Sequence, residues 1–397
     1  MSTPNPVFDK KRHIKYWKRC ADLLPEQYTA GDGSRLSLAF FIIASLHLLD
    51  ALETTFSVRD RQAWIDWIYS LQVASGGFRG FPGTNLGDRR TLENEHWDPA
   101  NLHNTFMGLL TLLMLGDDLS RVRRKECLSW VKSLSRRNGS FGEMLGEGGI
   151  ILGKSDLRSV YCAVGIVFIL ADRDTASEWL DKDDIVRHLS NCQDHDGAFG
   201  QSYLREAHAG LNFCGMATLE LLDRLFTSEK SAKSGFASPL LDLEANIGWV
   251  LHRQTTWVND DDSDSEDENE EDSAIDNAPH DEPQAIPVGF GGRCNKMADT
   301  CYCFWNGGAL ALLKKENLIE ADGMRQYLHG STQHMIGGFS KVPGMLPDLL
   351  HAYAGLAALA IVGEVGLETL DSALAVSQRT AARLKELRSS WSALKPD

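Results

Sequence analysis

The segment that decides the fold is VGFGGRCNKMADTCYCFWNGGALALL, residues 288–313. It opens with a glycine-aromatic turn, continues through a polar loop and ends in an apolar run over 301–313. This run is apolar almost all round, and a helix that is apolar on every face is normally buried. The order of turn, polar loop and buried helix predicts one unit of a larger packed structure.

The glycine-aromatic turn recurs along the chain. It reads SGGFRG at Phe78, NGSFGE at Phe141, DGAFGQ at Phe199, VGFGGR at Phe290 and IGGFSK at Phe339. The spacings are 63, 58, 91 and 49 residues, and the long one contains an acidic tract of thirty residues. Without that tract it falls to 61 (91 minus 30). A recurring spacing of this size indicates stacked supersecondary units.

Six apolar runs accompany these turns. They cover residues 37–49, 105–115, 160–170, 212–222, 301–313 and 351–362. The segments between them, such as 121–134 and 184–190, are amphipathic and would face solvent. The sequence therefore predicts an all-α fold, an (α/α)6 barrel of six helix pairs. Parallel inner helices would surround a central apolar cavity, and glycines would close turns that need positive φ. We expect residues 1–397 to form one such domain.

The negative charge of the chain is concentrated in one place. The formal net charge is −15, and residues 258–287 contain thirteen acidic residues and no Lys or Arg. The rest carries about −2 (−15 plus 13), so no broad basic face for nucleic acid is expected. We expect residues 258–287 to be a disordered surface insertion. Its DDDSD, residues 260–264, matches the DDxxD pattern of terpene synthases, but in a loop rather than on a cavity helix.

The cysteines and the hydropathy indicate a cytoplasmic setting. The eight cysteines are irregularly spaced in a chain much longer than a disulfide-stapled mini-domain. We find no signal peptide, no run of eighteen uncharged apolar residues that could span a membrane, and no lipidation signal in the final SALKPD. If the protein handles lipid, we expect it to do so as an enzyme or carrier.

A candidate metal site lies where the polar loop becomes the apolar helix. Asp299 and Cys301 are two residues apart, and because Asp299 would precede the helix, both side chains can approach one ion. His351 begins the next inner helix and offers a third ligand. Carboxylate, thiolate and imidazole suit zinc, and three ligands leave one position open. The alternative is that Cys301 only packs in the core, as we expect of its neighbour Cys303.

Cations gather at the starts of the same inner helices. Arg293 and Lys296 precede the metal pair, and His208 in REAHAGLNFCG opens another inner helix. Positive side chains at helix N-termini can bind a diphosphate. The alternative for each residue is ordinary surface charge.

With these motifs the chain resembles the β subunits of protein prenyltransferases. The resemblance runs from KKRHIKYWKRCADLLPEQY to the last inner helix, and is most specific in the RCNK box, the DxCYxFW segment and LHAYAGL. It implies one Zn²⁺ per β subunit, bound by Asp299, Cys301 and His351, which holds the cysteine of a C-terminal CaaX sequence as thiolate. It also implies a heterodimer with an α subunit, an allylic diphosphate as donor, and CaaX-terminated small GTPases, such as the Rho and Rac type, as acceptors.

The resemblance also assigns the lining of the cavity. Residues expected at the diphosphate are His208, Ala209, Gly210, Arg293, Cys294, Asn295, Lys296, Tyr302 and Lys341. Residues expected along the isoprenoid are Ser37, Arg158, Tyr161, Leu211, Cys214, Cys303, Phe304 and Trp305. Residues expected at the peptide are Phe41, Asn101, His103 and Leu350.

Three positions favour the type I geranylgeranyltransferases within this family. Ser37 stands where farnesyltransferases place a bulky tryptophan on the cavity floor, which leaves room for twenty carbons. Lys341 replaces the aspartate with which farnesyl- and Rab-modifying enzymes bind magnesium, so we expect no magnesium requirement. Leu350 replaces an aromatic residue beside the zinc histidine and, with Phe41, would shape a pocket for aliphatic CaaX residues.

One departure and several alternatives stay open. Type I enzymes commonly have a His-x-Ala pair near the pocket for the last CaaX residue, whereas this chain has Asn101 and His103. The resemblance therefore does not carry over a preference for leucine at that position. The nearest alternatives are the Rab-type (type II) geranylgeranyltransferase and the farnesyltransferase β subunit. Alternatives of another class are a terpene cyclase-like barrel and a non-catalytic binding module.

Overall fold

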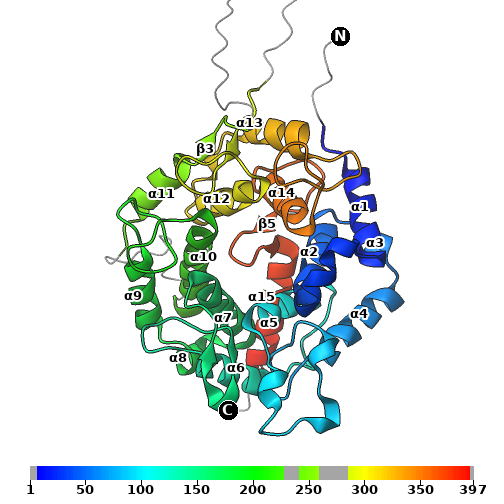
Figure 1. Ribbon diagram of the computed structural model, residues 1–397, viewed down its shortest axis with the longest axis vertical. Coiled ribbons are helices and arrows are strands. Elements are labelled where there is room, and N and C mark those ends of the chain that lie inside the picture. Colours follow the sequence, from blue (N-terminus) through cyan, green and yellow to red (C-terminus); the bar gives the residue numbers. More distant parts are fainter. Residues whose placement is uncertain (1–6, 228–240, 259–284, 394–397) are drawn as a thin grey trace, which may run out of the picture.

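Six inner helices form a closed ring in the computed structural model, which describes residues 7–227, 241–258 and 285–393 (Figure 1). Each inner helix packs against the next, and the last packs against the first. They are α2 (Arg35–Leu48), α5 (Leu102–Met114), α7 (Leu157–Leu170), α10 (Ala209–Phe226), α12 (Thr300–Leu312) and α14 (Leu349–Ile361). The predicted α/α barrel is confirmed.

An outer helix precedes each inner one, so the inner helices all run in the same direction. The outer helices are α1 (Lys10–Asp22), α4 (Val58–Ser70), α6 (Arg124–Ser133), α9 (Lys182–Cys192), α11 (Leu243–Leu251) and α13 (Ala321–Gln326), the last continued by a π-helical turn over Tyr327–Thr332. Shorter helices are α3 (Leu52–Thr55) and α8 (Ala176–Trp179), and α15 (Gln378–Ala393) ends the described chain. In the part of the chain that the structure describes, no helix combines the length and apolarity needed to cross a membrane.

The glycine-aromatic repeat forms small hairpins between outer and inner helices. Phe78, Phe141, Phe199 and Phe339 each form a β-bridge to a residue six positions earlier. Phe290 forms the equivalent pair with Gln254 between β3 (Gln254–Thr255) and β4 (Gly289–Phe290), 36 positions away. The excess of thirty (36 minus 6) places the acidic tract inside this hairpin. Most of the tract, including DDDSD, lies outside the described residues, so its predicted disorder stays a prediction.

The aromatic side chains of two hairpins pack against a glycine of the following inner helix. Phe199 and Phe339 are fully buried, and a Cβ added to Gly215 or Gly355 would lie 2.5 Å from the respective ring. The turns themselves contain glycines in the left-handed region, for example Gly337 with φ +86°. Glycine is thus required both for the turn and for the close approach of ring and helix.

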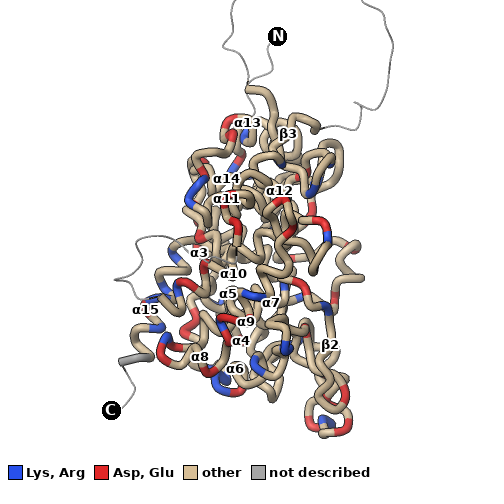
Figure 2. Tube along the Cα trace, turned by 90° about the vertical axis from the view of Figure 1, so that its left-hand side faces the viewer, with Lys and Arg blue, Asp and Glu red and all other residues tan. Residues whose placement is uncertain are grey.

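The hairpins also connect neighbouring inner helices at their N-terminal ends. The carbonyl two positions after the aromatic residue accepts a hydrogen bond from the first turn of the preceding inner helix. The pairs are Gly80 with Leu36, Glu143 with Leu102, Gly292 with Ala209 and Lys341 with Thr300. All N-terminal ends therefore meet at one rim, which also holds the hairpin of β1 (Met144–Leu145) and β2 (Ile151–Leu152) (Figure 2).

The opposite end of the ring is closed by the C-terminal part of the chain. The hairpin of β5 (Leu370–Asp371) and β6 (Val376–Ser377) lies among the inner helices and leads into α15 (Figures 1 and 2). The Tyr161 hydroxyl donates to the Ala373 carbonyl at 2.9 Å, and the Tyr353 hydroxyl donates to the Ala375 carbonyl at 2.5 Å. The interior is therefore open at the rim and blocked at the other end.

Candidate metal centre and substrate cavity

Asp299, Cys301 and His351 converge at the rim, on two adjacent inner helices. Asp299 is the N-cap of α12, with extended backbone angles (φ −142°, ψ 137°), and its Oδ1 accepts the Cys301 backbone N–H at 2.8 Å. His351 lies in the first turn of α14, with Nε2 3.3 Å from Asp299 Oδ1. One potential ligand atom from each residue lies within 4.8 Å of the other two. The three side chains that the sequence predicted to meet can therefore coordinate a single ion.

The surroundings of these residues favour a cation between them. Asp299 and Cys301 are 5% and 7% exposed. Burial, together with the Asp299 carboxylate, raises the pKa of the Cys301 thiol far above its ordinary value. Burial alone would lower the pKa of His351, but hydrogen bonds to Asp299 and Asp348 outweigh it and raise this pKa to about 9. A metal ion would reverse both effects, because its charge stabilises the thiolate and the neutral imidazole.

Lys341 lies beside the metal centre because of the hairpin connection. Its carbonyl accepts the N–H of Thr300, the first residue of α12, and its Nζ lies 3.9 Å from Asp299 Oδ2. The ammonium group is half exposed at the rim. It can therefore face a bound anion as well as Asp299.

A second group of polar side chains lies on the α10 side of the metal centre. His208 is the N-cap of α10, and its Nε2 lies 3.3 Å from the Tyr302 hydroxyl of α12. Burial lowers the pKa of His208, and the charges of Arg293 and Arg158 lower it further. Both arginines are exposed in part, with Arg293 3.0 Å from Glu206 and Arg158 2.5 Å from Asp156. This side of the mouth thus carries two partly exposed guanidinium groups, each paired with a carboxylate.

The RCNK loop is held over this group by its glycines. The Gly292 carbonyl accepts the Ala209 N–H at 3.0 Å, and a Cβ on Gly292 would lie 2.1 Å from the Tyr302 ring. Asn295 has a positive φ of 53°, so the chain turns sharply. Residues 293–296, with Cys294 among them, are all exposed at the rim.

Two residues predicted at the diphosphate, Ala209 and Gly210, use their backbone amides within the fold, and their contact with a diphosphate stays a prediction. The Ala209 N–H donates to Gly292, and the Gly210 N–H donates to His208 Nδ1 at 3.1 Å. Both amides already have partners, because the RCNK loop and the N-cap side chain satisfy the start of α10. An anion here would therefore rely on side chains.

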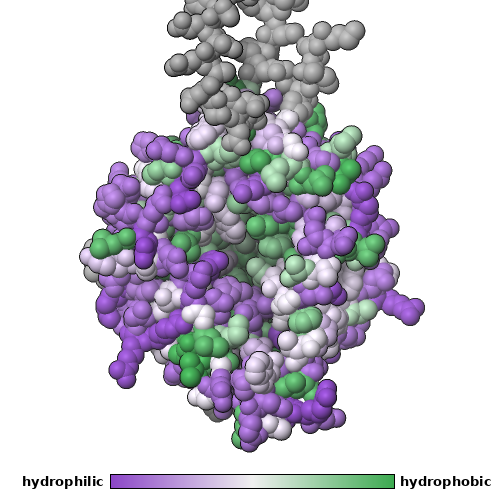
Figure 3. All heavy atoms as spheres, in the orientation of Figure 1, coloured by the Kyte–Doolittle hydropathy of each residue, from purple (hydrophilic) through white to green (hydrophobic). Residues whose placement is uncertain are grey.

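Aromatic side chains surround the cavity, some in its wall and some packed behind it. Ring contacts connect Phe106 to Tyr161, Tyr161 to Phe213, and Phe213 to Trp305, with centroids 5.1, 6.0 and 5.1 Å apart. Tyr353 continues the wall towards Phe41, at 5.5 Å. Figure 3 shows the resulting hollow at the centre of the rim face, with apolar side chains inside it. A long hydrocarbon would be buried here with about 0.8 kcal/mol per methylene.

The predicted isoprenoid contacts divide into two groups. Leu211 and Trp305 are half-buried, Tyr161 and Cys214 retain 8% and 6% exposure, and Arg158 is more exposed at the mouth. Cys303 and Phe304 have no exposed surface, so they support the wall from behind, as core packing of Cys303 requires, and their contact with the isoprenoid stays a prediction. α12 turns these two positions towards the neighbouring helices instead of the cavity.

Ser37 is small, as the argument from size requires, but it does not form the floor. It lies in the first turn of α2, near the rim, and its hydroxyl donates to Asn104 Oδ1 at 3.0 Å. The blocked end is formed by residues 370–377 instead. The predicted floor position is therefore wrong, and Ser37 belongs to the side wall.

The predicted peptide residues lie around the remaining part of the mouth. Phe41 contacts Tyr353, and Leu350 is half-buried beside His351 on α14. Asn101 is the N-cap of α5, and His103 follows in its first turn. Burial lowers the pKa of the His103 imidazole.

Several site residues were not predicted from the sequence. These are Phe213 and Tyr353 packed behind the wall, Asn104 beside Ser37, Asp348 beside His351, and the hairpin over residues 370–377. Asp348 had a signal in the sequence, because an Asp just before an apolar run is a common helix start. The hairpin had none, since its place inside the ring depends on tertiary packing.

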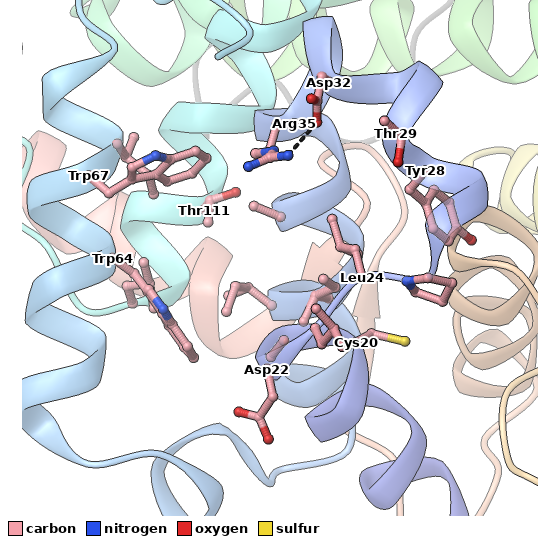
Figure 4. A pocket seen from close by; sticks show the side chains of 18 residues that line it. Cys20, Asp22, Leu24, Tyr28, Thr29, Asp32, Arg35, Trp64, Trp67 and Thr111 are labelled. Carbon is pink, nitrogen blue, oxygen red and sulfur yellow. Dashed lines mark hydrogen bonds and ion pairs between the residues drawn. The ribbon is translucent and has the colours of Figure 1, made fainter. Parts of the chain in front are cut away.

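A separate cleft lies outside the ring, between α1 and α4. Its volume is about 460 Å³, and it is lined by Leu24 and Tyr28 on one side and by Trp64 and Trp67 of α4 on the other (Figure 4). A larger, more polar cavity of about 850 Å³ lies at the blocked end, beside α15. Neither contains any of the predicted site residues.

Comparisons with known proteins agree with the geometry. Residues 8–376 match the prenyltransferase alpha-alpha toroid domain. The chain is 33% identical over 382 residues to the geranylgeranyl transferase type-1 subunit beta of Arabidopsis thaliana, covering 93% of this chain and 89% of the relative. It is 30% identical over 396 residues to the subunit of the same name from Dictyostelium discoideum, covering 94% and 97%.

A solved structure shows the same fold. This is the Candida albicans protein geranylgeranyltransferase-I complexed with GGPP, which superposes with a TM-score of 0.77 at 23% identity. The match covers 96% of this chain and 99% of that chain. The ring of helix pairs is therefore shared over the full length of the described fold.

Proposed function

Since the chain belongs to the prenyltransferase alpha-alpha toroid family, we propose that it is the catalytic β subunit of a type 1 geranylgeranyl transferase. It transfers the geranylgeranyl group of geranylgeranyl diphosphate to the cysteine thiol of a C-terminal CaaX sequence. The observation that carries the proposal is the meeting of Asp299, Cys301 and His351 at the mouth of an aromatic-lined cavity.

The donor set of the metal centre suits zinc. Asp299, Cys301 and His351 would hold a Zn²⁺ ion, whose charge would stabilise the acceptor sulfur as thiolate at neutral pH. Cys301 and His351 must be deprotonated to serve as ligands. The buried Asp299 carboxylate and the hydrogen bond from His351 to Asp348 hold these groups in place.

The remaining polar residues act on the donor. The acceptor sulfur forms a bond to the first carbon of the isoprenoid as the bond from that carbon to the diphosphate oxygen breaks. Arg293, Lys296, His208 and Tyr302 stabilise the negative charge that grows on the leaving diphosphate. Lys341 supplies a further positive charge 3.9 Å from Asp299, which supports transfer without magnesium.

The choice of donor depends on the room beside α2. Ser37 occupies little volume in the first turn, and the aromatic wall continues past it to Phe41 and Tyr353. A twenty-carbon chain needs one isoprene unit more than a fifteen-carbon chain. The small side chain of Ser37 therefore supports geranylgeranyl diphosphate, rather than farnesyl diphosphate, as the donor.

The rim offers apolar side chains for an α subunit. They lie on the loops that lead into the inner helices, and are Leu92, Trp97, Ile150, Tyr203, Leu204, Met345 and Leu346, each more than half exposed. Exposed apolar residues that gather around one opening are typical of a protein interface. We propose that an α subunit covers part of this rim, and that CaaX-terminated small GTPases of the Rho and Rac type reach the site beside it, in the cytoplasm.

The chain is proposed to act as one domain over residues 1–397, with residues 258–287 as a dispensable acidic insertion. The pairing of Gln254 with Phe290 supports this, because the hairpin is complete on either side of the tract. The rival activities are Rab modification and farnesylation. Lys341 argues against Rab modification, and Ser37 argues against farnesylation.

The proposal is tested by single-turnover transfer with the reconstituted heterodimer in magnesium-free buffer. We expect a short CaaX peptide to be modified without an escort protein, with geranylgeranyl diphosphate preferred over farnesyl diphosphate. Preference for the fifteen-carbon donor would contradict the type 1 assignment. A requirement for a Rab protein and its escort would indicate the type II enzyme instead.

A further inference from the structure

The cleft between α1 and α4, which we call the α1–α4 cleft, has the dimensions of a small-molecule site. Its volume of about 460 Å³ lies within the range of roughly 300–1,000 Å³ that is common for such sites. The inner helices α2 and α5 form its floor with Ala39, Ile42, Ile43, Thr111 and Leu115. An apolar body could therefore be buried here, outside the ring and apart from the cavity assigned above.

The walls of the α1–α4 cleft are aromatic and held in place by the fold. Trp64 and Trp67, one turn apart on α4, form one wall, and Tyr28 lies in the other (Figure 4). All three side chains are half-buried. The Tyr28 hydroxyl accepts the Leu349 N–H at 2.8 Å, and the Trp64 ring packs edge-on against Phe56 with centroids 4.7 Å apart. Because these rings are already ordered, a ligand would lose little free energy in ordering them.

The charges of the α1–α4 cleft are unevenly distributed. Its lining contains one cation, Arg35, and two carboxylates, Asp22 and Asp32, which gives a net charge of −1 (1 minus 2). Arg35 forms an ion pair with Asp32. Within the part of the chain that the structure describes, no ion pair or hydrogen bond is recorded for the Asp22 carboxylate. Figure 4 shows Asp22 at the same end of the cleft as Trp64, whereas Arg35 lies at the opposite end with Trp67.

This combination of groups favours a positively charged ligand. The faces of Trp and Tyr rings attract cations, and aromatic cages of this kind recognise quaternary ammonium groups. We propose that the α1–α4 cleft binds an organic ammonium ion that carries an aromatic or branched apolar body. The ammonium group lies between Trp64 and Asp22, and the apolar body covers the floor towards Trp67. This site is additional to the proposed prenyl transfer and does not depend on it.

The test is a calorimetric titration of the zinc-loaded heterodimer, with geranylgeranyl diphosphate present to fill the central cavity. The probe is benzyltrimethylammonium. N-benzylacetamide, which is uncharged and of similar size, and the anion phenylacetate are titrated in parallel. We expect the dissociation constant of the ammonium ion to be about fivefold or more below that of N-benzylacetamide. Phenylacetate should bind most weakly, because the Asp22 carboxylate repels it.

Substitutions in the α1–α4 cleft locate the bound probe. Trp64→Leu and Asp22→Asn should each raise the dissociation constant of the ammonium ion by about threefold or more. Trp64→Phe keeps an aromatic face, so its dissociation constant should lie between those of the unmodified protein and Trp64→Leu. Asp66→Asn is the matched control. It removes the same charge from α4, but Asp66 pairs with Arg121 at 2.6 Å and does not line the cleft.

Each result decides for or against the ammonium site. Equal affinity for the ammonium ion and N-benzylacetamide would overturn the inference and leave a groove that recognises apolar groups alone. Absence of saturable binding would overturn it too, as would an affinity that none of the cleft variants changes. If Trp64→Leu failed to fold, Asp22→Asn would decide, because Asp22 is exposed at the end of α1. Loss of prenyl transfer with retained ammonium binding would count against the proposed function alone.

Discussion

Asp348 holds His351 by two hydrogen bonds, one to the backbone and one to the ring. As the N-cap of α14, Asp348 accepts the His351 N–H with Oδ1 at 3.0 Å. Its Oδ2 lies 2.6 Å from His351 Nδ1. The carboxylate thereby fixes the ring so that Nε2 faces Asp299 and the metal position. A helix cap and a metal-ligand partner are combined in one side chain.

The first prediction concerns this cap. Asp348→Asn preserves the capping oxygen but weakens the hold on the ring, so we expect zinc affinity to fall by about 10–100-fold with little loss of stability. Asp348→Ala should lose the same affinity and about 1 kcal/mol of unfolding free energy as well. Competition with a chromophoric chelator measures the first effect, and urea denaturation of the metal-free protein measures the second. Unchanged affinity in Asp348→Asn would contradict the assigned role.

The second prediction separates the two cysteines of α12. Cys301→Ala removes a metal ligand, so bound zinc and transfer should fall by more than the ~10–100-fold that loss of a ligand's partner costs. Cys303→Ala should retain both, because its buried sulfur lies 3.9 Å from the Asp299 carbonyl and takes no part in the site. Metal content per heterodimer and single-turnover rates measure the difference. If both variants retained zinc equally, the metal centre would be assigned incorrectly.

The third prediction concerns donor length. Ser37→Trp fills the side wall in the first turn of α2, so we expect transfer from geranylgeranyl diphosphate to fall by about tenfold or more, while transfer from farnesyl diphosphate is retained. Ser37→Ala is the control, because it removes the hydrogen bond to Asn104 without adding volume. Equal loss in both variants would mean that the hydroxyl, rather than the room beside it, decides the donor.

The fourth prediction concerns pH and the closure of the ring. His13 of α1 is fully buried between Phe8 and Phe339, with Nε2 2.9 Å from Gln333 Oε1 and Nδ1 accepting the Gly338 N–H. Burial lowers its pKa from 6.5 to about 4, although the hydrogen bond to Gln333 acts in the opposite direction. The unfolded state therefore binds the extra proton between pH 6.5 and 4.

The contribution of His13 to the free energy of unfolding is therefore fully present above pH 6.5. It is lost as the pH falls from 6.5 to about 4. The loss amounts to about 3 kcal/mol over that interval. Urea denaturation between pH 7.5 and 5 should show the slope, and His13→Gln should reduce it. An unaltered slope in the variant would show that other groups cause the acid sensitivity.

The fifth prediction concerns the contact between hairpin and helix. Gly355→Ala places a Cβ 2.5 Å from the buried Phe339 ring, so we expect a loss of about 1–3 kcal/mol in unfolding free energy. Gly307→Ala is the matched control on α12, where the nearest atom would be 3.6 Å away. It should be neutral or stabilising, because alanine is the better helix former by about 1 kcal/mol. Thermal denaturation of both variants checks the difference.

Much of the fold could be predicted because the periodic residues are also the packing residues. Phe199 and Phe339 mark the turns, bridge back to their outer helices and fill the space beside a glycine of the next helix. The candidate metal ligands could also be predicted from the sequence, because Asp299 and Cys301 lie on either side of a helix start. Prediction was weaker for contacts that depend on helix rotation, such as the direction in which Phe304 points.

The sequence by itself determined the ring of helix pairs and the three side chains that meet at the candidate metal centre. Local signals suffice for these, since turns, caps and apolar runs act within a few residues. Only the tertiary structure decided that residues 370–377 block one end, that Ser37 lies in the side wall, and that Asn104 connects it to Asn101. Those relationships depend on how distant segments pack against one another. Periodicity and composition are local properties of the sequence, so they do not predict this packing.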